Sequence, residues 1–281
     1  MEFTLLTDEQ RLSFENDGYL IVRDALDTEM VNRLLETGDR LMDGFKYEGF
    51  YAHRRDGLVQ EDAFAELVTN SKTVPLIIQL LGNNLHVTNT ALIYKHPQPL
   101  GSLDNVNWHR DVGVSLDLGH ANLPRVGLKV GYCLTDFTVP NSGATLFVRG
   151  SNKYPEPLAI PEGDVHPPEY EEVFMKPGDA FLFESRTYHA PGINCQKETA
   201  KVVIYGYHFR WVKADYYLHY YNDRRQPDEQ LTEKLDDIGR QLLGACTDTK
   251  GNFDPNGHEW PLREWASGHG LPEQSPHTVV I

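Results

Sequence analysis

The chain has 281 residues, of which 40% are hydrophobic and 24% carry charge, and its formal net charge is −15. This length suits one large core without requiring a second domain, and the acidic balance argues against nucleic acid and anionic membranes as partners. The three cysteines share no CxxC spacing, the N-terminus has no signal-peptide pattern, and no segment approaches the roughly 18 apolar residues that a bilayer span needs. We therefore expect a cytoplasmic protein that does not cross a membrane.

Residues 8–82 predict helices around one short strand. Thr7 begins a capping-box pattern that opens the first helix, and Gly18 marks the end of that helix. A compact apolar strand follows at 19–22, and Asp27 is placed to cap a second helix with apolar residues at helical spacing. Two further helical patterns lie at about 61–69 and 71–81.

Residues 85–210 change to short apolar segments separated by Gly, Pro and Asn, a pattern that is typical of strands. In the C-terminal extension, 211–281, a helical pattern returns at 228–243, and the remaining tail predicts loop. We find no repeat and no linker, so we expect one domain over 1–281, mainly β with flanking helices and an antiparallel core. The predicted strands are 86–95, 106–112, 127–135, 144–148, 172–175, 180–185 and 200–209.

Two histidines and one aspartate form a candidate metal site. His109 and Asp111 are two residues apart, and an extended backbone puts such residues on one face, so both can reach one metal ion. His189 follows an apolar strand, which we expect to end at this histidine. Two imidazoles and one carboxylate leave positions open on a ferrous ion, so these residues predict a non-heme Fe(II) site.

Zinc is the main competing metal. A structural zinc site normally has four protein ligands, and no cysteine beside these three residues offers the fourth. Zinc hydrolases also use two histidines and a carboxylate, but they need a placed general base, and the sequence gives no clear candidate. An isolated histidine is more often a hydrogen-bonded core residue than a ligand, and the grouping of three ligand types makes that explanation weak here.

Seven short motifs follow one another along the chain, at 92–97, 108–111, 132–138, 141–146, 149–153, 176–179 and 189–194. Their order, more than any one of them, resembles the phytanoyl-CoA dioxygenase family of Fe(II)/2-oxoglutarate oxygenases. The likeness covers roughly residues 8–210.

This resemblance implies a double-stranded β-helix, a cupin-like jelly roll that holds iron at its open end. It implies Fe(II) as cofactor and 2-oxoglutarate as co-substrate, with O2 used to oxidise a C–H bond of a small organic molecule and succinate and CO2 released. Related halogenases replace the carboxylate ligand with a small residue, so Asp111 points to an oxygenase outcome, most simply hydroxylation in specialised metabolism. A cupin-fold isomerase or hydrolase that does not use 2-oxoglutarate is the alternative, and a barrel that binds a ligand without redox chemistry is a third hypothesis.

The chain departs from the family where 2-oxoglutarate is held. The family has an arginine shortly after the distal histidine, which pairs with the C5 carboxylate, whereas this chain has Ala200 followed by Lys201. If the preceding loop is one residue longer than usual, Lys201 takes the arginine's place, as a point charge without the bidentate fork. Otherwise Lys129 or Arg210 is the candidate. The resemblance also places the Tyr132 side chain beside the co-substrate, with a core aromatic residue of the strand as the alternative. Thr90, which precedes the lysine at the end of its strand, is a further candidate to hydrogen-bond the co-substrate.

Two aromatic clusters are candidates for a substrate pocket. One lies at 50–55, where the resemblance places the barrel mouth, and contains Tyr51 and His53. The other begins at Trp211 and includes Tyr216. Aromatic side chains with polar tips suit an organic substrate with few charges, although a helix that packs its aromatic residues on the barrel would also explain the second cluster.

Overall fold

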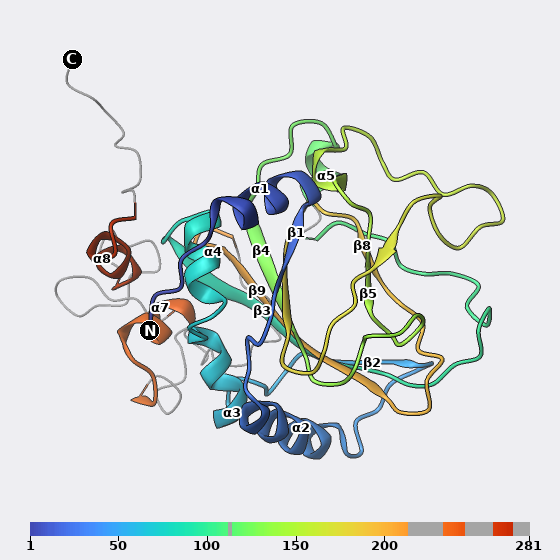
Figure 1. Cartoon of the computed structure of the whole chain (residues 1–281), viewed down its shortest axis with the longest axis horizontal. Helices are drawn as coiled ribbons and strands as arrows, with labels where there is room; N and C mark the ends of the chain where they lie inside the picture. Colours follow the sequence, from blue (N-terminus) through green and yellow to red (C-terminus); the bar gives the residue numbers. More distant parts are fainter. Residues whose placement is uncertain (112–113, 213–232, 245–260, 272–281) are drawn as a thin grey trace.

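A computed structural model describes residues 1–111, 114–212, 233–244 and 261–271. Within these residues the strands form two antiparallel sheets, one of six strands in the order β1-β7-β4-β9-β3-β2 and one of three in the order β6-β5-β8. The smaller sheet lies on one side of the larger sheet, and the N-terminal helices lie on the other (Figure 1). The result confirms a mainly β protein with flanking helices and a jelly-roll, or double-stranded β-helix, core.

The strands alternate between the two sheets in the second half of the core, so that the chain crosses repeatedly from one sheet to the other. The strands are β1 (Tyr19–Val22), β2 (Tyr51–Arg54), β3 (Leu85–Lys95), β4 (Gly127–Cys133), β5 (Thr145–Phe147), β6 (Glu171–Glu172), β7 (Ala180–Glu184), β8 (His189–Pro191) and β9 (Ala200–Phe209).

The helices pack mainly on the outer face of the larger sheet (Figure 1). None of the helices in the described parts of the chain combines the length and the apolar character needed to span a bilayer. They are α1 (Asp8–Asp17), α2 (Thr28–Met42), α3 (Asp62–Ala65), α4 (Val74–Leu81), α5 (Val114–Leu118), α7 (Asp237–Leu242) and α8 (Pro261–Gly268), with short 3-10 helices η1 (Glu66–Thr69) and η2 (Ser151–Lys153).

Local capping explains where the first two long helices begin. The Thr7 side chain accepts a hydrogen bond from the Gln10 backbone, and the Gln10 side chain accepts one from Thr7, so the predicted capping box forms. Gly18 ends α1 in the left-handed region, with φ 83°. The Asp27 side chain accepts from the Met30 backbone and caps α2 as predicted.

Both faces of the larger sheet are buried. Leu128, Val130 and the other residues of β4 that point to the same face pack against the helices. Ile93 and Val202 point to the opposite face of the sheet, toward the smaller sheet. Successive residues of a strand point to opposite faces, so the phase of each strand decides which side chains reach the space between the sheets.

Several strand predictions differ from the structure, and of the strand predicted at 172–175 only Glu172 belongs to a strand, β6. Within the described part of 106–112, pairing is limited to an isolated bridge between His109 and His189. The predicted strand at 180–185 ends at Glu184, and His189 begins the separate strand β8 of the smaller sheet. Strand β2 falls in the aromatic cluster at 50–55, where no strand was predicted.

The C-terminal extension also differs from the prediction. A continuous helix over 228–243 is wrong in its described part, because residues 234–236 are not helical and Asp236 caps the shorter helix α7. The tail, predicted as loop, contains α8, which buries Leu262 and Ala266. These two residues are four apart and lie on one helical face, a signal too short to separate from chance.

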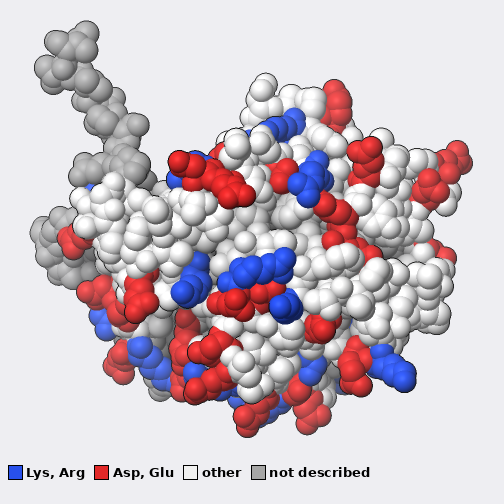
Figure 2. All heavy atoms as spheres, in the orientation of Figure 1, with Lys and Arg blue, Asp and Glu red and all other residues white. Residues whose placement is uncertain are grey.

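The surface mixes charges of both signs. Figure 2 shows Lys and Arg side chains interspersed with Asp and Glu on the face that it presents. No basic stripe of the kind that follows a nucleic-acid backbone is visible on that face.

Candidate metal centre and pocket

His109, Asp111 and His189 come together in the space between the sheets. Their candidate ligand atoms all lie within 4.8 Å of one another, and each histidine Nε2 lies 3.7 Å from a different oxygen of Asp111. Main-chain pairing produces this arrangement, because the backbone nitrogen of each histidine donates to the carbonyl oxygen of the other at 3.1 Å. The Asp111 nitrogen donates to Ser185 O at 2.8 Å, which continues the same extended path.

Each imidazole is oriented by a main-chain carbonyl two residues earlier. Nδ1 of His109 lies 2.9 Å from Asn107 O, and Nδ1 of His189 lies 3.0 Å from Thr187 O. A carbonyl oxygen can only accept, so Nδ1 donates in both rings and each Nε2 keeps its lone pair for a metal. Burial lowers the pKa of His189 to about 3, so this ring is neutral near physiological pH.

Asp111 is buried and ionised. Burial by itself would raise its pKa, but Lys129 and the two imidazoles hold the pKa of Asp111 well below its usual range. Lys129 Nζ donates to Asp111 Oδ1 at 2.6 Å, whereas the buried Oδ2 has no hydrogen-bond partner in the described part of the chain. A carboxylate oxygen left free beside two imidazole lone pairs matches the donor set of Fe(II), so the residues present fit this metal.

The three side chains line a pocket of about 730 Å³. This volume lies in the range of roughly 300–1,000 Å³ that is common for small-molecule sites. Apolar side chains from the larger sheet, among them Phe181, Phe183 and Ile204, form one part of its wall. The polar side chains in the wall include Tyr51, His53, Arg55, Thr88, Asn89, Thr90, Lys95, Lys129 and His208.

Four more of the residues predicted from the sequence line this pocket, namely Tyr51, His53, Thr90 and Lys129. Thr90 Oγ1 donates to the carbonyl oxygen of Arg55 at 3.0 Å, and Arg55 Nε lies 3.3 Å from His53 Nε2. Burial lowers the pKa of His53 to about 4, so its ring stays neutral. The wall formed by β2 and β3 is therefore aromatic and polar without a carboxylate of its own.

Lys201 and Tyr132 face the helices instead of the pocket. Lys201 Nζ lies 2.5 Å from Asp39 Oδ1 and 4.9 Å from the ring centre of Tyr94, its cross-strand partner. The Tyr132 hydroxyl lies 2.7 Å from Thr73 Oγ1 of the segment that opens α4. The expectation that these two residues hold 2-oxoglutarate is wrong, because strand alternation turns them to the outer face.

Two other predicted residues also lie away from the pocket. Arg210 follows the far end of β9 and is not among the described residues that line the pocket. Trp211 is 65% exposed, and its ring stacks on the ring of Phe209. It is not among the described residues that line the pocket. Tyr216 lies outside the described residues.

Lys95, Arg110 and His208 also line the pocket and were not predicted as site residues, whereas Arg55 belongs to the predicted 50–55 cluster. His208 is almost fully buried, with Nδ1 2.6 Å from Thr88 Oγ1 and Nε2 3.3 Å from Ser185 Oγ. Burial lowers its pKa to about 3. Alternation along 200–209 groups His208 with Ala200, but both faces of this strand are apolar, so the sequence does not show which face meets the pocket.

The phytanoyl-CoA dioxygenase (PhyH) family model matches residues 14–198. Comparison with curated protein sequences gives no significant match. Among solved structures, HygX from Streptomyces hygroscopicus with nickel and 2-oxoglutarate bound is 18% identical and has a TM-score of 0.61, over 75% of this chain and 90% of that chain.

Two further structures are similar. The epimerase SnoN, in complex with Fe3+, alpha ketoglutarate and nogalamycin RO, is 20% identical, with a TM-score of 0.58 over 72% of this chain and 82% of that one. The alpha ketoglutarate-dependent carbocyclase SnoK from nogalamycin biosynthesis is 17% identical, with a TM-score of 0.55 over 72% and 84%. These identities support the shared fold, and the family match covers more than half of the chain. The chain therefore belongs to the phytanoyl-CoA dioxygenase family of Fe(II)/2-oxoglutarate-dependent oxygenases.

Proposed function

We propose that this protein oxidises a C–H bond of a small organic molecule, with hydroxylation as the expected outcome and specialised metabolism as the setting. The proposal rests mainly on Asp111, whose buried Oδ2 has no hydrogen-bond partner among the described residues and whose two oxygens each lie 3.7 Å from the Nε2 atom of a different histidine. The similarity to SnoN and SnoK, both from nogalamycin biosynthesis, supports the setting. Because one of these is an epimerase and the other a carbocyclase, proteins with this fold catalyse more than one kind of reaction.

His109, Asp111 and His189 would hold the iron through Nε2, Oδ2 and Nε2. Bound Fe(II) with 2-oxoglutarate supplies an oxidant derived from O2, and succinate and CO2 are the co-products. Lys129 keeps Asp111 ionised and fixes Oδ1, which leaves Oδ2 as the ligand atom. The retained carboxylate occupies a position that a halide would need, which favours oxygenation over halogenation.

The apolar part of the wall limits water around the metal. Phe181 and Phe183 are almost fully buried, and the Phe183 ring centre lies 4.6 Å from that of His189. A dry wall of this kind protects a reactive oxidant from side reactions and strengthens the electrostatic interactions inside the site.

We propose that the substrate lies against the β2 and β3 wall. Tyr51, His53, Arg55 and Thr90 offer aromatic surface and hydrogen-bonding groups there. The neutral His53 ring and the Tyr51 hydroxyl suit a substrate with hydroxyl, carbonyl or ether groups more than one with several positive charges. O2 and this small molecule are the proposed partners of the site.

The test is consumption of 2-oxoglutarate. Protein loaded with Fe(II) is supplied with 2-oxoglutarate and air, and succinate is measured against an Asp111→Ala variant prepared in the same way. We expect succinate from the wild type, with stimulation by pocket-sized oxygenated organic compounds, and only background from the variant. Equal, background-level succinate from both proteins would reject the oxygenase proposal and favour a metal-dependent isomerase or hydrolase.

A further inference from the structure

Lys95 places a buried cation in the wall of the pocket. The residue is 3% exposed, and its Nζ donates to Gly143 O at 2.6 Å. Within the described residues no carboxylate forms an ion pair with it. A buried ammonium with two donor positions left over is costly unless a ligand supplies the opposite charge.

The strand register puts Lys95 beside the position where the family has its arginine. Lys95, the last residue of β3, pairs with Ala200, the first residue of β9. The next inward pair, Ile93 and Val202, lines the pocket on both strands, and Lys95 lines it as well. Directly opposed residues of an antiparallel pair point to the same face, so Lys95 reaches the space that a long side chain at position 200 would enter.

The backbone at Gly143 lies close enough to Lys95 to accept a hydrogen bond from its ammonium group. Its φ is +86°, and a Cβ placed on it would lie 2.9 Å from the Ala200 Cβ and 3.5 Å from the Lys95 Cδ. Glycine therefore lets the backbone come close enough for its carbonyl oxygen to orient the lysine. The small Ala200 leaves the room that the arginine would otherwise fill.

The two other lysines considered from the sequence are less suitable for a ligand carboxylate in this part of the pocket. Lys201 is paired with Asp39 on the outer face. Lys129 is held by Asp111 Oδ1 at 2.6 Å, and releasing it would leave a metal ligand carboxylate buried without its counter-charge. Among the described residues, no carboxylate forms an ion pair with Lys95, so binding a ligand would not break an existing pair.

We propose that Lys95 binds the C5 carboxylate of 2-oxoglutarate, so that the anchoring cation has moved from β9 to the neighbouring strand β3. This inference rests on the proposed function. It predicts that the ammonium keeps its hydrogen bond to Gly143 O and donates its two remaining hydrogens to the carboxylate. Burial lowers the pKa of Lys95 to about 8 in the free protein, and a bound carboxylate would raise it again.

The test compares two keto acids that differ only at C5. Binding of 2-oxoglutarate and of 2-oxopentanoate, which lacks the C5 carboxylate, is measured by calorimetry on Fe(II)-loaded protein without O2. We expect wild type to prefer 2-oxoglutarate by about tenfold to a hundredfold, the range for one charge-assisted interaction. Lys95→Met should bind both acids equally, Lys95→Arg should retain much of the preference, and Lys201→Met, the matched lysine on the outer face, should behave as wild type.

A measurement on the wild type alone covers the case in which Lys95→Met does not fold. Near pH 8.5, calorimetry in buffers of different ionisation enthalpy reports the protons taken up on binding. We expect roughly half a proton or more in excess for 2-oxoglutarate over 2-oxopentanoate, because only the former recharges Lys95. Cys133, the titratable neighbour on β4, stays a neutral thiol because burial raises its pKa.

The outcomes separate the inference from the proposed function. If Lys95→Met keeps the wild-type preference, or if the two acids cause equal proton uptake, Lys95 is not the anchor although the protein binds 2-oxoglutarate. If wild type binds neither acid, both the inference and the proposed function fail.

Discussion

The two nitrogen ligands of the candidate metal centre owe their orientation to the main chain. Each Nδ1 donates to the carbonyl oxygen two residues earlier, Asn107 O for His109 and Thr187 O for His189. Backbone carbonyls are fixed by the sheet, so the rings are held before metal arrives. Asp111 is different, because its orientation depends on the side chain of Lys129.

Lys95 leads to a prediction about stability and pH in the absence of 2-oxoglutarate. Burial lowers the pKa of Lys95 to about 8 from the ordinary 10.5, so between these values the unfolded chain binds more protons than the folded chain. The cost of burying the charge is fully present below pH 8 and is relieved as the pH rises, so the free energy of unfolding should increase with pH across this window.

We expect Lys95→Met to lack this increase. In urea unfolding, wild type should gain up to about 2 kcal/mol relative to the variant between pH 8 and about pH 9.5. The comparison stops there because tyrosines begin to titrate near pH 10. A difference between the two proteins that stays constant with pH would contradict a buried, unpaired Lys95.

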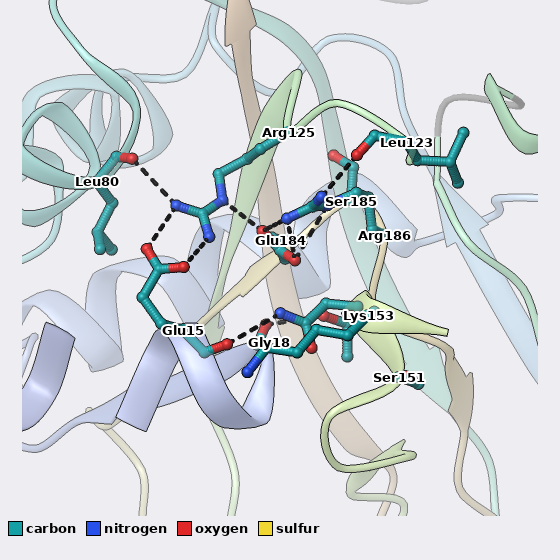
Figure 3. Close-up of polar contacts among 12 residues, drawn as sticks. Glu15, Gly18, Leu80, Leu123, Arg125, Ser151, Lys153, Glu184, Ser185 and Arg186 are labelled. Carbon is teal, nitrogen blue, oxygen red and sulfur yellow. Dashed lines mark hydrogen bonds and ion pairs between the residues drawn. The ribbon is translucent and has the colours of Figure 1, made fainter. Parts of the chain in front are cut away.

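At the scale of elements, an ion-pair cluster braces the connection between β7 and β8, which carries His189. Glu184 at the end of β7 is fully buried and is bonded by Arg125 and by Arg186, whose Nη2 lies 2.9 Å from Oε1. Arg125 also pairs with Glu15 of α1 at 2.7 Å (Figure 3). The cluster therefore ties the N-terminal helix to the turn that positions a metal ligand.

Glu184→Gln should destabilise the protein strongly. The substitution leaves two arginines without their shared carboxylate, and breaking a buried pair from one side costs about 3 kcal/mol or more in the free energy of unfolding. Glu66→Gln is the matched control, because its pair with Arg33 at 2.6 Å is exposed and such pairs contribute less than about 1 kcal/mol. Chemical denaturation measures both, and equal small losses would mean that the cluster does not brace this turn.

The sheet also explains what could and could not be predicted from the sequence. The helix starts at Thr7 and Asp27 are local, since a cap needs only residues three positions away. The pairing of His109 with Asp111 could be predicted for the same reason, because two residues two positions apart on an extended strand share one face. The phase of β9 is not local, because both of its faces are buried and apolar, so alternation along the strand does not distinguish the pocket face from the helix face.

Because the sequence does not show which residues of β9 face the pocket, Lys201 was expected there although it faces the helices. The role proposed for Lys95 depends on a cross-strand register with Ala200, and the register becomes visible only in the folded sheet. His189 is an intermediate case. The sequence located it as a ligand but placed it at the end of a strand, whereas it begins β8.

At the scale of the whole molecule, we propose that residues 1–281 form one domain. The C-terminal helices share the core of the N-terminal ones, with Leu242 and Leu262 fully buried in it. The Trp265 indole donates to Met1 O at 3.0 Å, so the two ends of the described chain meet. Figure 1 shows α7 and α8 beside the N-terminus, next to the helices that cover the larger sheet.

One domain predicts one cooperative unfolding transition. Leu242→Ala in α7 should lower the free energy of unfolding by about 2–5 kcal/mol, because it opens a cavity in the shared core, and should move the circular dichroism and fluorescence midpoints together. Leu116→Ala, at an 86% exposed position of α5, should change neither midpoint. Two separate transitions, with only one shifted by Leu242→Ala, would show that the C-terminal extension unfolds independently.

The chemistry proposed for the pocket requires that His109, Asp111 and His189 hold Fe(II) so that 2-oxoglutarate can bind beside them. The visible absorption spectrum of anaerobic protein with Fe(II) and 2-oxoglutarate tests this most directly. We predict a weak charge-transfer band that forms only when protein, metal and keto acid are all present and that is lost in His109→Ala. A wild-type protein that remains folded and gives no band, or a His109→Ala variant that keeps it, would mean that these residues do not form the iron site.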